Sequence, residues 1–259
     1  MIIGVDHIAL NVEDPGRAAA DFKAVLGRKV TFDGSGPQPD FARLQLDNVA
    51  IGIIGAISTA DNTEAAPAIR LVFATGDIDK AAHRLTRRGL PGAFRQNAKR
   101  TFDIDPGATH GVPISFATAE TAVDRDANAD IAGLDHIVIR TPDPERAVAL
   151  YGGRLGLDLR LDRTNPAFGN RLLFFVCGDL VVEVSHDTKK GLGAGADRIR
   201  GLAWRAKDID RAHARMTASG IDVSEMRTGR RPGTQVFTVK SHTAGVPTLV
   251  IGGEGLNRA

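Results

Sequence analysis

The chain has 259 residues, of which 42% are hydrophobic, 25% charged and 5% aromatic. This composition is typical of a globular protein and excludes disordered, collagen-like and coiled-coil chains. The 33 basic and 31 acidic residues give a net charge of +2, so the chain as a whole has no charge-driven attraction to nucleic acid or to an anionic membrane.

The first residues, MIIGVDHIALNVEDP, lack a basic start and turn acidic at Asp6, which is not the pattern of a signal peptide. No uncharged apolar run approaches the roughly 20 residues of a membrane span. The single cysteine, Cys177, cannot form a disulfide within the chain, so nothing requires an oxidising compartment. We therefore expect a soluble, cytoplasmic protein.

The sequence contains an internal duplication with an offset of 129 residues. GVDHIALNVEDPGRAAADF, beginning at Gly4, returns as GLDHIVIRTPDPERAVALY, beginning at Gly133. Each half divides again, because IRLVFATGDIDKAAHRL and IRGLAWRAKDIDRAHARM follow the same pattern of strand, aspartate and amphipathic helix. Repeats of this kind predict a modular architecture. The modules span residues 1–57, 66–119, 132–186 and 197–253.

Within each module the elements follow one order. A short apolar strand ends at an aspartate suited to capping a helix N-terminus, and a glycine suited to ending that helix comes 12 or 13 residues later. The aspartates are Asp14, Asp77, Asp143 and Asp208, and the glycines are Gly27, Gly89, Gly156 and Gly220. Hairpin strands follow each helix. The sequence therefore predicts an α+β protein of four βαβββ modules.

The polar segment from Glu120 to Asp130 predicts a boundary between two domains, residues 1–120 and 131–259. Two further polar segments, Ser58–Ala66 and Asp187–Asp197, connect the modules inside each half. The second, DTKKGLGAGAD, is rich in glycine, and we interpret it as a linker in preference to a lid over a site.

The DHI motif in a first strand, with a glutamate in a closing strand, resembles the vicinal oxygen chelate superfamily. The segments GLDHIVIRTPDPERAVALY, RLLFFVCGDLVVEV, RTGRRPGTQVFTV and GVPTLVIG carry this resemblance. The superfamily includes glyoxalase I, methylmalonyl-CoA epimerase, bleomycin and fosfomycin resistance proteins and extradiol dioxygenases. The resemblance implies that paired modules form a cup, with metal ligands on the first and last strand of each module. The two domains would then be glyoxalase-like, with the site in the C-terminal one.

At these ligand positions module 3 has His136 and Glu183, which both suit a divalent metal. Module 4 has Gly201 and, in its last strand, Thr248 or Leu249. The C-terminal cup thus supplies two ligands where the metal enzymes of the family use three or four. In the N-terminal cup, His7 faces Gly52, Arg70 and Ser115, and we expect no metal there.

The pair His136 and Glu183 has three interpretations. It is a buried structural pair, a general base with its partner, or an incomplete site for zinc, nickel, manganese or iron completed by water or by the bound molecule. A carboxylate in an apolar cup can abstract a proton next to a carbonyl group. His186 lies at an odd spacing from Glu183, so in a regular strand it points to the opposite face.

Arginines are the candidates for binding an anionic group, because a guanidinium contacts a carboxylate or phosphate at two points. We expect Arg227 and Arg231, in the turn-forming RTGRRPG segment, to bind substrate, with Arg171 facing the same cup. A small residue at Gly201 favours an open cavity. Trp204 is interpreted as core, Cys177 shows no nucleophile motif, and no motif for a nucleotide cofactor is present.

These features predict a glyoxalase-like enzyme of lyase or isomerase type that acts on a small, oxygen-rich, anionic metabolite. The main alternative is a non-catalytic binding protein of the bleomycin-resistance kind. Extradiol ring cleavage ranks third, because it needs two histidines and a carboxylate around iron, and Gly201 replaces one histidine. The expected partner is a small molecule, with neither nucleic acid nor membrane involved, and the chain is expected to be a monomer or homodimer.

Overall fold

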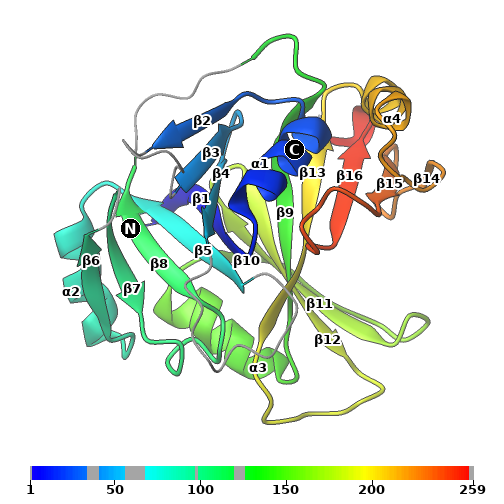
Figure 1. Cartoon of the computed structure of the whole chain (residues 1–259). Helices are drawn as coiled ribbons and strands as arrows, with labels where there is room; N and C mark the ends of the chain where they lie inside the picture. Colours follow the sequence, from blue (N-terminus) through cyan, green and yellow to red (C-terminus); the bar gives the residue numbers. More distant parts are fainter. Residues whose placement is uncertain (1, 34–40, 56–67, 97–98, 120–125, 257–259) are drawn as a thin grey trace. The chain divides into compact units, whose positions relative to one another are not determined.

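A computed structural model describes residues 2–33, 41–55, 68–96, 99–119 and 126–256 (Figure 1). A strand, a helical segment and three further strands follow one another four times along the chain. The predicted α+β fold of four βαβββ modules is confirmed. The predicted domain boundary lies partly in residues 120–125, and the connector Ser58–Ala66 lies wholly outside the described residues.

The elements of modules 1 and 2 are β1 Ile2–Val12, α1 Pro15–Leu26, β2 Val30–Asp33, β3 Phe41–Gln45, β4 Ala50–Gly55, β5 Ala68–Thr75, α2 Ile78–Arg87, β6 Gly92–Gln96, β7 Arg100–Ile104 and β8 Ile114–Thr118. Those of modules 3 and 4 are β9 Ile131–Arg140, α3 Pro144–Ala147, the π-helix η1 Val148–Arg154, β10 Asp158–Asn165, β11 Asn170–Cys177, β12 Leu180–Asp187, β13 Arg198–Ala206, α4 Ile209–Ala218, β14 Arg227–Thr228, β15 Gln235–Val239, β16 Thr248–Gly252 and the 3₁₀ turn η2 Glu254–Leu256.

The strands form two eight-stranded sheets, one for each half of the sequence. The first sheet has the order β2-β3-β4-β1-β5-β8-β7-β6, and the second has the order β10-β11-β12-β9-β13-β16-β15-β14. Within modules 2, 3 and 4 the first strand pairs in parallel with the last strand of the same module. This pairing places the first-strand and last-strand positions of a module side by side.

The helix starts follow from the sequence as predicted. The side chain of each capping aspartate accepts a hydrogen bond from a backbone amide in the first turn of its helix, as Asp14 does from Arg17 and Asp208 from Arg211. These bonds satisfy amides that have no partner inside the helix. The four closing glycines have φ between +64° and +78°, a left-handed conformation that glycine adopts without steric cost.

The helix of module 3 differs from the prediction. The expected three-turn α-helix is one α-helical turn, Pro144–Ala147, followed by the π-helix Val148–Arg154. The amide of Leu155 accordingly donates to the carbonyl of Leu150, five residues earlier. Gly152 and Gly153 lie in this segment.

The chain divides into two compact units that do not coincide with the two sheets. Unit 1 combines residues 1–7, 70–121 and 136–200, which are mainly modules 2 and 3. Unit 2 combines residues 8–69, 122–135 and 201–259, which are mainly modules 1 and 4. Each half of the sequence therefore contributes to both units.

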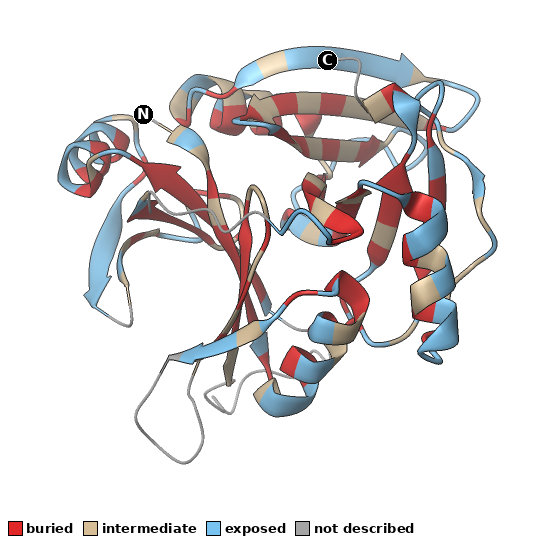
Figure 2. Cartoon of the chain, turned by 90° about the horizontal axis from the view of Figure 1, so that it is seen from above, coloured by how far each residue is buried: buried red, intermediate tan, exposed pale blue. Residues whose placement is uncertain are grey.

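Buried residues lie on the strands and on one side of the helices (Figure 2). Most of them are apolar and form the core of each unit. In unit 1 the fully buried ring of Tyr151 packs against Phe175, with centroids 5.6 Å apart. In unit 2 Trp204 is fully buried, as predicted, and Phe237 meets the ring of His213 edge-on at 4.9 Å. Contacts of this kind add to the free energy gained by removing the rings from water.

In each unit an arginine of one module binds the C-terminal end of the other module's helix. In unit 2 the Arg215 guanidinium donates to the carbonyls of Ala24 and Val25 at the end of α1 and to both carboxylate oxygens of buried Asp130. In unit 1 Arg88 donates to the carbonyl of Arg154 at 3.1 Å. These donors satisfy carbonyls that lack partners at a helix end and oppose the negative end of its dipole.

Candidate functional site

His136 and Glu183 lie next to each other in unit 1, on the two parallel central strands of module 3. Strand pairing sets Val181 opposite His136 and Glu183 opposite Val138, so all four side chains share one face. The Nε2 atom of His136 is 3.8 Å from Oε2 of Glu183, and the two side chains are 17% and 18% exposed. The structure thus brings the predicted pair together and leaves it accessible from this face.

The nearest neighbours of the pair on this face are apolar, and Ser185 lies two residues beyond Glu183. Phe174 of β11 lies directly opposite Glu183, Val176 lies opposite Val181, and Leu172 shares the same face two residues away. We call this surface the open face of module 3, and it consists of His136, Glu183, Val138, Val181, Leu172, Phe174 and Val176. A carboxylate on such a surface is less solvated than one in water, and this strengthens its interaction with a bound polar group.

Arg171 does not face this surface, so the sequence prediction is wrong for its position. It pairs with His186 across β11 and β12, and His186 is three residues beyond Glu183 and therefore on the opposite face, as expected. The Arg171 guanidinium binds both carboxylate oxygens of Asp162, at 2.8 and 2.7 Å, and Oε1 of Glu145 in α3 at 2.6 Å. These hydrogen bonds lower the pKa of Asp162 and make Arg171 a link between strand and helix.

His186 is buried, and its Nδ1 atom lies 3.2 Å from the carbonyl oxygen of Thr141. This contact belongs to the side of the sheet that faces the helix. Cys177, at the end of β11, is also buried, and burial raises the pKa of its thiol to about 12. Neither side chain extends the open face of module 3.

Module 4 presents different residues on the equivalent face. Ala203 pairs with Leu249, Leu249 with Thr238, and Val236, two residues before Thr238, pairs with Arg227. Leu249, and not Thr248, therefore occupies the last-strand position on this face. The Thr248 hydroxyl instead donates to the Val246 carbonyl at 2.8 Å.

Gly201 occupies the first-strand position of module 4. A Cβ atom built on Gly201 would lie 3.0 Å from the carbonyl oxygen of Pro247 and 3.6 Å from its Cβ. The amide of Leu202 also donates to this carbonyl at 3.0 Å. The glycine therefore allows the turn before β16 to approach the backbone of β13 closely. The sequence alone does not reveal this structural reason for a small residue.

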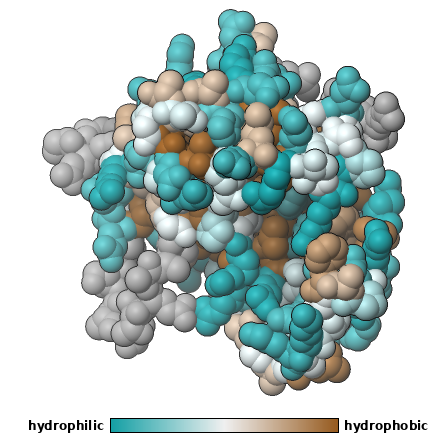
Figure 3. Space-filling view, turned by 90° about the vertical axis from the view of Figure 1, so that its right-hand side faces the viewer, coloured by the Kyte–Doolittle hydropathy of each residue, from teal (hydrophilic) through white to brown (hydrophobic). Residues whose placement is uncertain are grey.

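The two arginines predicted to bind an anion are in unit 2. Arg227 is exposed on the same face as Thr238, and its guanidinium lies 3.4 Å from both the Thr238 and Ser224 hydroxyls. Arg231 is exposed in the following turn, where its carbonyl accepts hydrogen bonds from Thr234. The side of the molecule that carries β14 to β16 shows hydrophilic side chains around apolar patches (Figure 3).

The residues at the ligand positions do not fit the divalent metal that the sequence resemblance implied. Module 3 offers one nitrogen and one carboxylate, whereas module 4 offers Gly201 and Leu249, which carry no donor atom in their side chains. Within the described ranges, no three side chains of His, Cys, Asp or Glu are grouped as a metal site would require. We therefore assign no metal-dependent step to this site.

The corresponding positions of modules 1 and 2 hold structural contacts. His7 binds the neighbouring Asp6 at 2.7 Å, and Lys99 binds the same carboxylate at 2.6 Å. Burial opposes ionisation of Asp6, but the hydrogen bonds from His7 and Lys99 outweigh it and lower its pKa. Arg70 donates to the Ser115 hydroxyl at 2.9 Å, as expected for an arginine and a serine on adjacent strand positions.

Sequence reasoning missed a basic pocket in unit 1. It lies where β9 and β12 end and β13 begins, and the glycine-rich segment 188–197 forms one wall of it. Its cationic side chains are Arg140, Lys190, Arg198 and Arg200. KKGLGAGADRIR carries a signal for this pocket, because basic residues flank small ones, although its glycine content alone is typical of a linker.

Comparison with known proteins agrees with this architecture. Residues 135–238 match the family model of the Glyoxalase/Bleomycin resistance protein/Dioxygenase superfamily. The predicted resemblance to the vicinal oxygen chelate superfamily is confirmed. No curated protein sequence matches the chain. Residues 135–238 thus resemble this superfamily in sequence.

Solved structures share the fold over almost the whole chain. A triple mutant of 4-hydroxymandelate synthase from Streptomyces coelicolor has a TM-score of 0.74 at 12% identity, covering 98% of this chain and 94% of that one. The Mn(II)-bound glyoxalase from Novosphingobium aromaticivorans has a TM-score of 0.71 at 14% identity, covering 97% and 82%. The 2,2',3-trihydroxybiphenyl 1,2-dioxygenase from Sphingomonas wittichii strain RW1 has a TM-score of 0.71 at 17% identity, covering 98% and 91%.

Among the residues that the structure describes, no helix combines the length and the apolar character that crossing a bilayer requires.

Proposed function

We propose that the chain is an enzyme of lyase or isomerase type that acts on a small, oxygen-rich, anionic metabolite at the open face of module 3. The observation that supports this proposal is the His136–Glu183 pair, which is accessible and has apolar nearest neighbours on its face of the sheet. A purely structural pair of this kind needs no accessible position. An acid–base pair does, because it has to contact the substrate.

In the proposed chemistry the Glu183 carboxylate removes a proton from a carbon next to a carbonyl group. The C–H bond breaks, and its electron pair moves to the carbonyl oxygen to form an enolate. The proton then returns to the same or a neighbouring atom, giving an isomer, or a leaving group departs, giving a lyase product. This step needs a base and a group that stabilises the enolate oxygen.

His136 is the proposed stabilising group. Its Nε2 atom is 3.8 Å from the carboxylate, longer than a hydrogen bond, so Glu183 does not hold the ring through this contact. In the proposed geometry the imidazole faces a substrate oxygen while the carboxylate faces the adjacent carbon. Arg227 and Arg231, which are both exposed in unit 2, are proposed separately as candidates for binding an anion.

A non-catalytic binding protein is the second candidate function. Gly201 and Leu249 favour it, because module 4 supplies no reactive side chain at the positions equivalent to His136 and Glu183. The same residues disfavour extradiol ring cleavage, for which a second histidine and a carboxylate on module 4 are missing. We place the protein in the cytoplasm, as a monomer or homodimer.

The test is deuterium exchange at acidic carbon positions. A panel of 2-oxo and 2-hydroxy carboxylic acids is first screened for a thermal shift, and NMR in D₂O then follows the C–H signals of the compounds that bind. We expect catalysed exchange that falls at least about 100-fold in Glu183→Gln, a typical loss for a general base. Glu225→Gln, which removes an exposed carboxylate of unit 2, is the matched control and should leave the rate unchanged.

Three results would count against this proposal. Saturable binding without exchange would point to the binding protein. Exchange that persists in Glu183→Gln would remove Glu183 as the base. Equal losses in Glu183→Gln and Glu225→Gln would show a general effect of charge instead of a specific role.

A further inference from the structure

The sheet face that carries the acid–base pair continues beyond it toward the end of β12. Ser185 lies two residues after Glu183, so its side chain is on the same face of the sheet. Strand pairing sets Ser185 between Leu172 of β11 and Arg140 of β9, and all these residues belong to unit 1. Ser185 is therefore the first polar side chain that β12 presents on this face beyond the pair.

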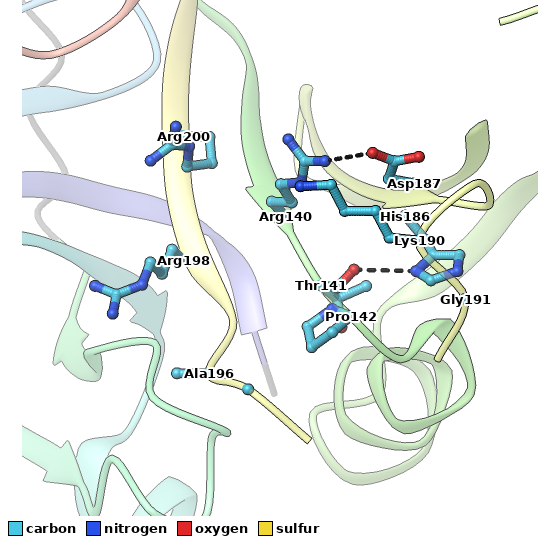
Figure 4. Close-up of a pocket in the computed structure, with 11 residues that line it drawn as sticks. Arg140, Thr141, Pro142, His186, Asp187, Lys190, Gly191, Ala196, Arg198 and Arg200 are labelled. Carbon is cyan, nitrogen blue, oxygen red and sulfur yellow. Dashed lines mark hydrogen bonds and ion pairs between the residues drawn. The ribbon is translucent and has the colours of Figure 1, made fainter. Parts of the chain in front are cut away.

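A second uncharged polar side chain lies close to Ser185. Asn170 is two residues before Leu172 on β11, so it shares this face and is diagonal to Ser185, with Cα atoms roughly 7–8 Å apart. Its direct partner across the strands is Asp187, whose carboxylate accepts a hydrogen bond from Arg140 at 2.9 Å (Figure 4). We call these four residues the polar end of the face: Ser185, Asn170, Arg140 and Asp187.

The two uncharged groups have unused hydrogen-bonding capacity. In the ranges that the structure describes, neither the Ser185 hydroxyl nor the Asn170 side-chain amide forms a hydrogen bond, although both residues are half-buried. The Oδ1 atom of Asn170 is itself buried without a partner. A partly buried polar group that forms no hydrogen bond costs free energy, and a bound polar group lowers this cost. Ser185 and Asn170 are therefore suited to binding a polar group of a ligand.

The charged groups of the polar end offset each other. Arg140 and Asp187 form an ion pair, so the polar end has no net charge to attract an anion. A ligand carboxylate would lie near the Asp187 carboxylate, and the two like charges would repel each other. A hydroxyl group avoids this repulsion, and it both donates and accepts hydrogen bonds, as Ser185 and Asn170 do. The polar end therefore favours a hydroxyl over a carboxylate.

The stretch between the acid–base pair and the polar end is apolar. Val138 lies opposite Glu183, and Leu172 lies opposite Ser185. The two residues from Glu183 to Ser185 span about 7 Å, at roughly 3.3 Å per residue. A hydrocarbon chain on Val138 and Leu172 removes apolar surface from water, which favours binding. A short alkyl chain thus fits between the two polar ends of a ligand.

We propose that Ser185 and Asn170 determine substrate specificity, and that the substrate is an oxo acid with a hydroxyl group at the far end of a short alkyl chain. This inference rests on the proposed function, because Glu183 defines where the reacting carbon lies. The alkyl chain packs on Val138 and Leu172. The terminal hydroxyl forms hydrogen bonds with the Ser185 hydroxyl and the Asn170 amide.

Three acids that differ only at their last carbon test the proposal: 2-oxoheptanoate, 7-hydroxy-2-oxoheptanoate and 2-oxoheptanedioate. Calorimetric titration at constant ionic strength measures their dissociation constants with the parent protein and with Glu183→Gln. We expect 7-hydroxy-2-oxoheptanoate to bind about tenfold more tightly than either of the other two. Ser185→Ala should reduce this preference to less than about threefold without changing the affinity for 2-oxoheptanoate, and Asn170→Ala should lower the preference in the same way.

The matched control is Ser219→Ala, which removes an exposed hydroxyl at the end of α4 in unit 2 and should leave the preference unchanged. Ser185→Ala breaks no hydrogen bond of its side chain in the described structure, so thermal unfolding should confirm that it folds like the parent. The proposal is overturned if the parent binds none of the three acids, binds 2-oxoheptanoate or 2-oxoheptanedioate as tightly as the hydroxy acid, or keeps its preference in Ser185→Ala.

Deuterium exchange at carbon 3 of the same acids separates this proposal from the proposed function. A preference for the hydroxy acid without catalysed exchange would support the specificity of Ser185 and Asn170 and count against an enzyme. Catalysed exchange without the preference would support the enzyme and overturn the specificity. The two failures are therefore distinguishable with one set of compounds.

Discussion

Modules 3 and 4 are two copies of one βαβββ unit, and they differ most where their sheets can carry chemistry. On one face module 3 has His136 and Glu183, while the equivalent positions of module 4 have Gly201 and Leu249. The strand order, the aspartate cap and the closing glycine are the same in both copies. Duplication has thus preserved the fold in both modules and the reactive groups in only one.

The contacts of α4 indicate what module 4 contributes instead. Its Arg215 holds buried Asp130 and the end of α1, whereas in unit 1 Arg88 makes a single bond to the end of η1. Arg215 therefore contributes more to the stability of unit 2 than Arg88 contributes to that of unit 1. Four predictions test this division between a reactive module 3 and a structural module 4.

The largest effect is expected for Arg215→Met. Removing the guanidinium leaves the Asp130 carboxylate, in a residue only 5% exposed, without its ion-pair partner. The free energy of unfolding should fall by about 3 kcal/mol, the cost of leaving one member of a buried pair uncompensated. Arg88→Met should cost only about 1 kcal/mol, the worth of one hydrogen bond. Urea unfolding measures both, and equal losses would contradict the comparison.

A smaller effect is expected from truncating equivalent positions of the two modules. His136→Ala should slow deuterium exchange at least about tenfold, because the enolate oxygen loses its stabilising partner. Leu249→Ala, at the position of module 4 that corresponds to Glu183, should change the rate less than twofold. Comparable losses of exchange rate in both variants would mean that module 4 also takes part in the reaction, which would contradict a reactive role for module 3 alone.

The smallest effect is expected for Arg171→Gln, because Arg171 lies on the side of module 3 away from His136 and Glu183. Substrate affinity should stay within about twofold, and the loss of an exposed ion pair should cost less than about 1 kcal/mol. A tenfold loss of substrate affinity would contradict this prediction and show that Arg171 takes part in binding.

The pH dependence of unfolding should report on the contact between Arg171 and Asp162. The Arg171 hydrogen bonds lower the pKa of Asp162 in the folded state. The stabilisation by this pair is therefore complete above the unfolded carboxyl pKa of about 3.9 and is lost as the pH falls through the lower folded value. Arg171→Gln should remove this part of the acid sensitivity, and unfolding followed between pH 5 and pH 2 measures the difference.

Much of the fold was predictable because its signals are local. Each aspartate cap, closing glycine and alternating strand depends on neighbours a few residues away, and the duplication presents each signal several times. The pair His136 and Glu183 was predictable for the same reason, since strand alternation alone brings both to one face. The π-helix was not, because the choice between α and π turns around Gly152 depends on tertiary packing.

Positions set by distant contacts also escaped prediction. Arg171 turns to the helix side because Asp162 and Glu145 bind it there, and the sequence around β11 does not reveal these partners. Gly201 is small because Pro247, 46 residues away, approaches its backbone. The basic pocket joins four separate segments, so the glycine-rich part of it has no local signature beyond its composition.

The chain has one tryptophan and one cysteine, and they lie in different compact units. Trp204 is fully buried in unit 2, and Cys177 is buried in unit 1. Indole fluorescence therefore reports the opening of one unit, while modification by a thiol reagent reports the opening of the other. A single denaturant series read by both signals measures the cooperativity between the units without any engineered label.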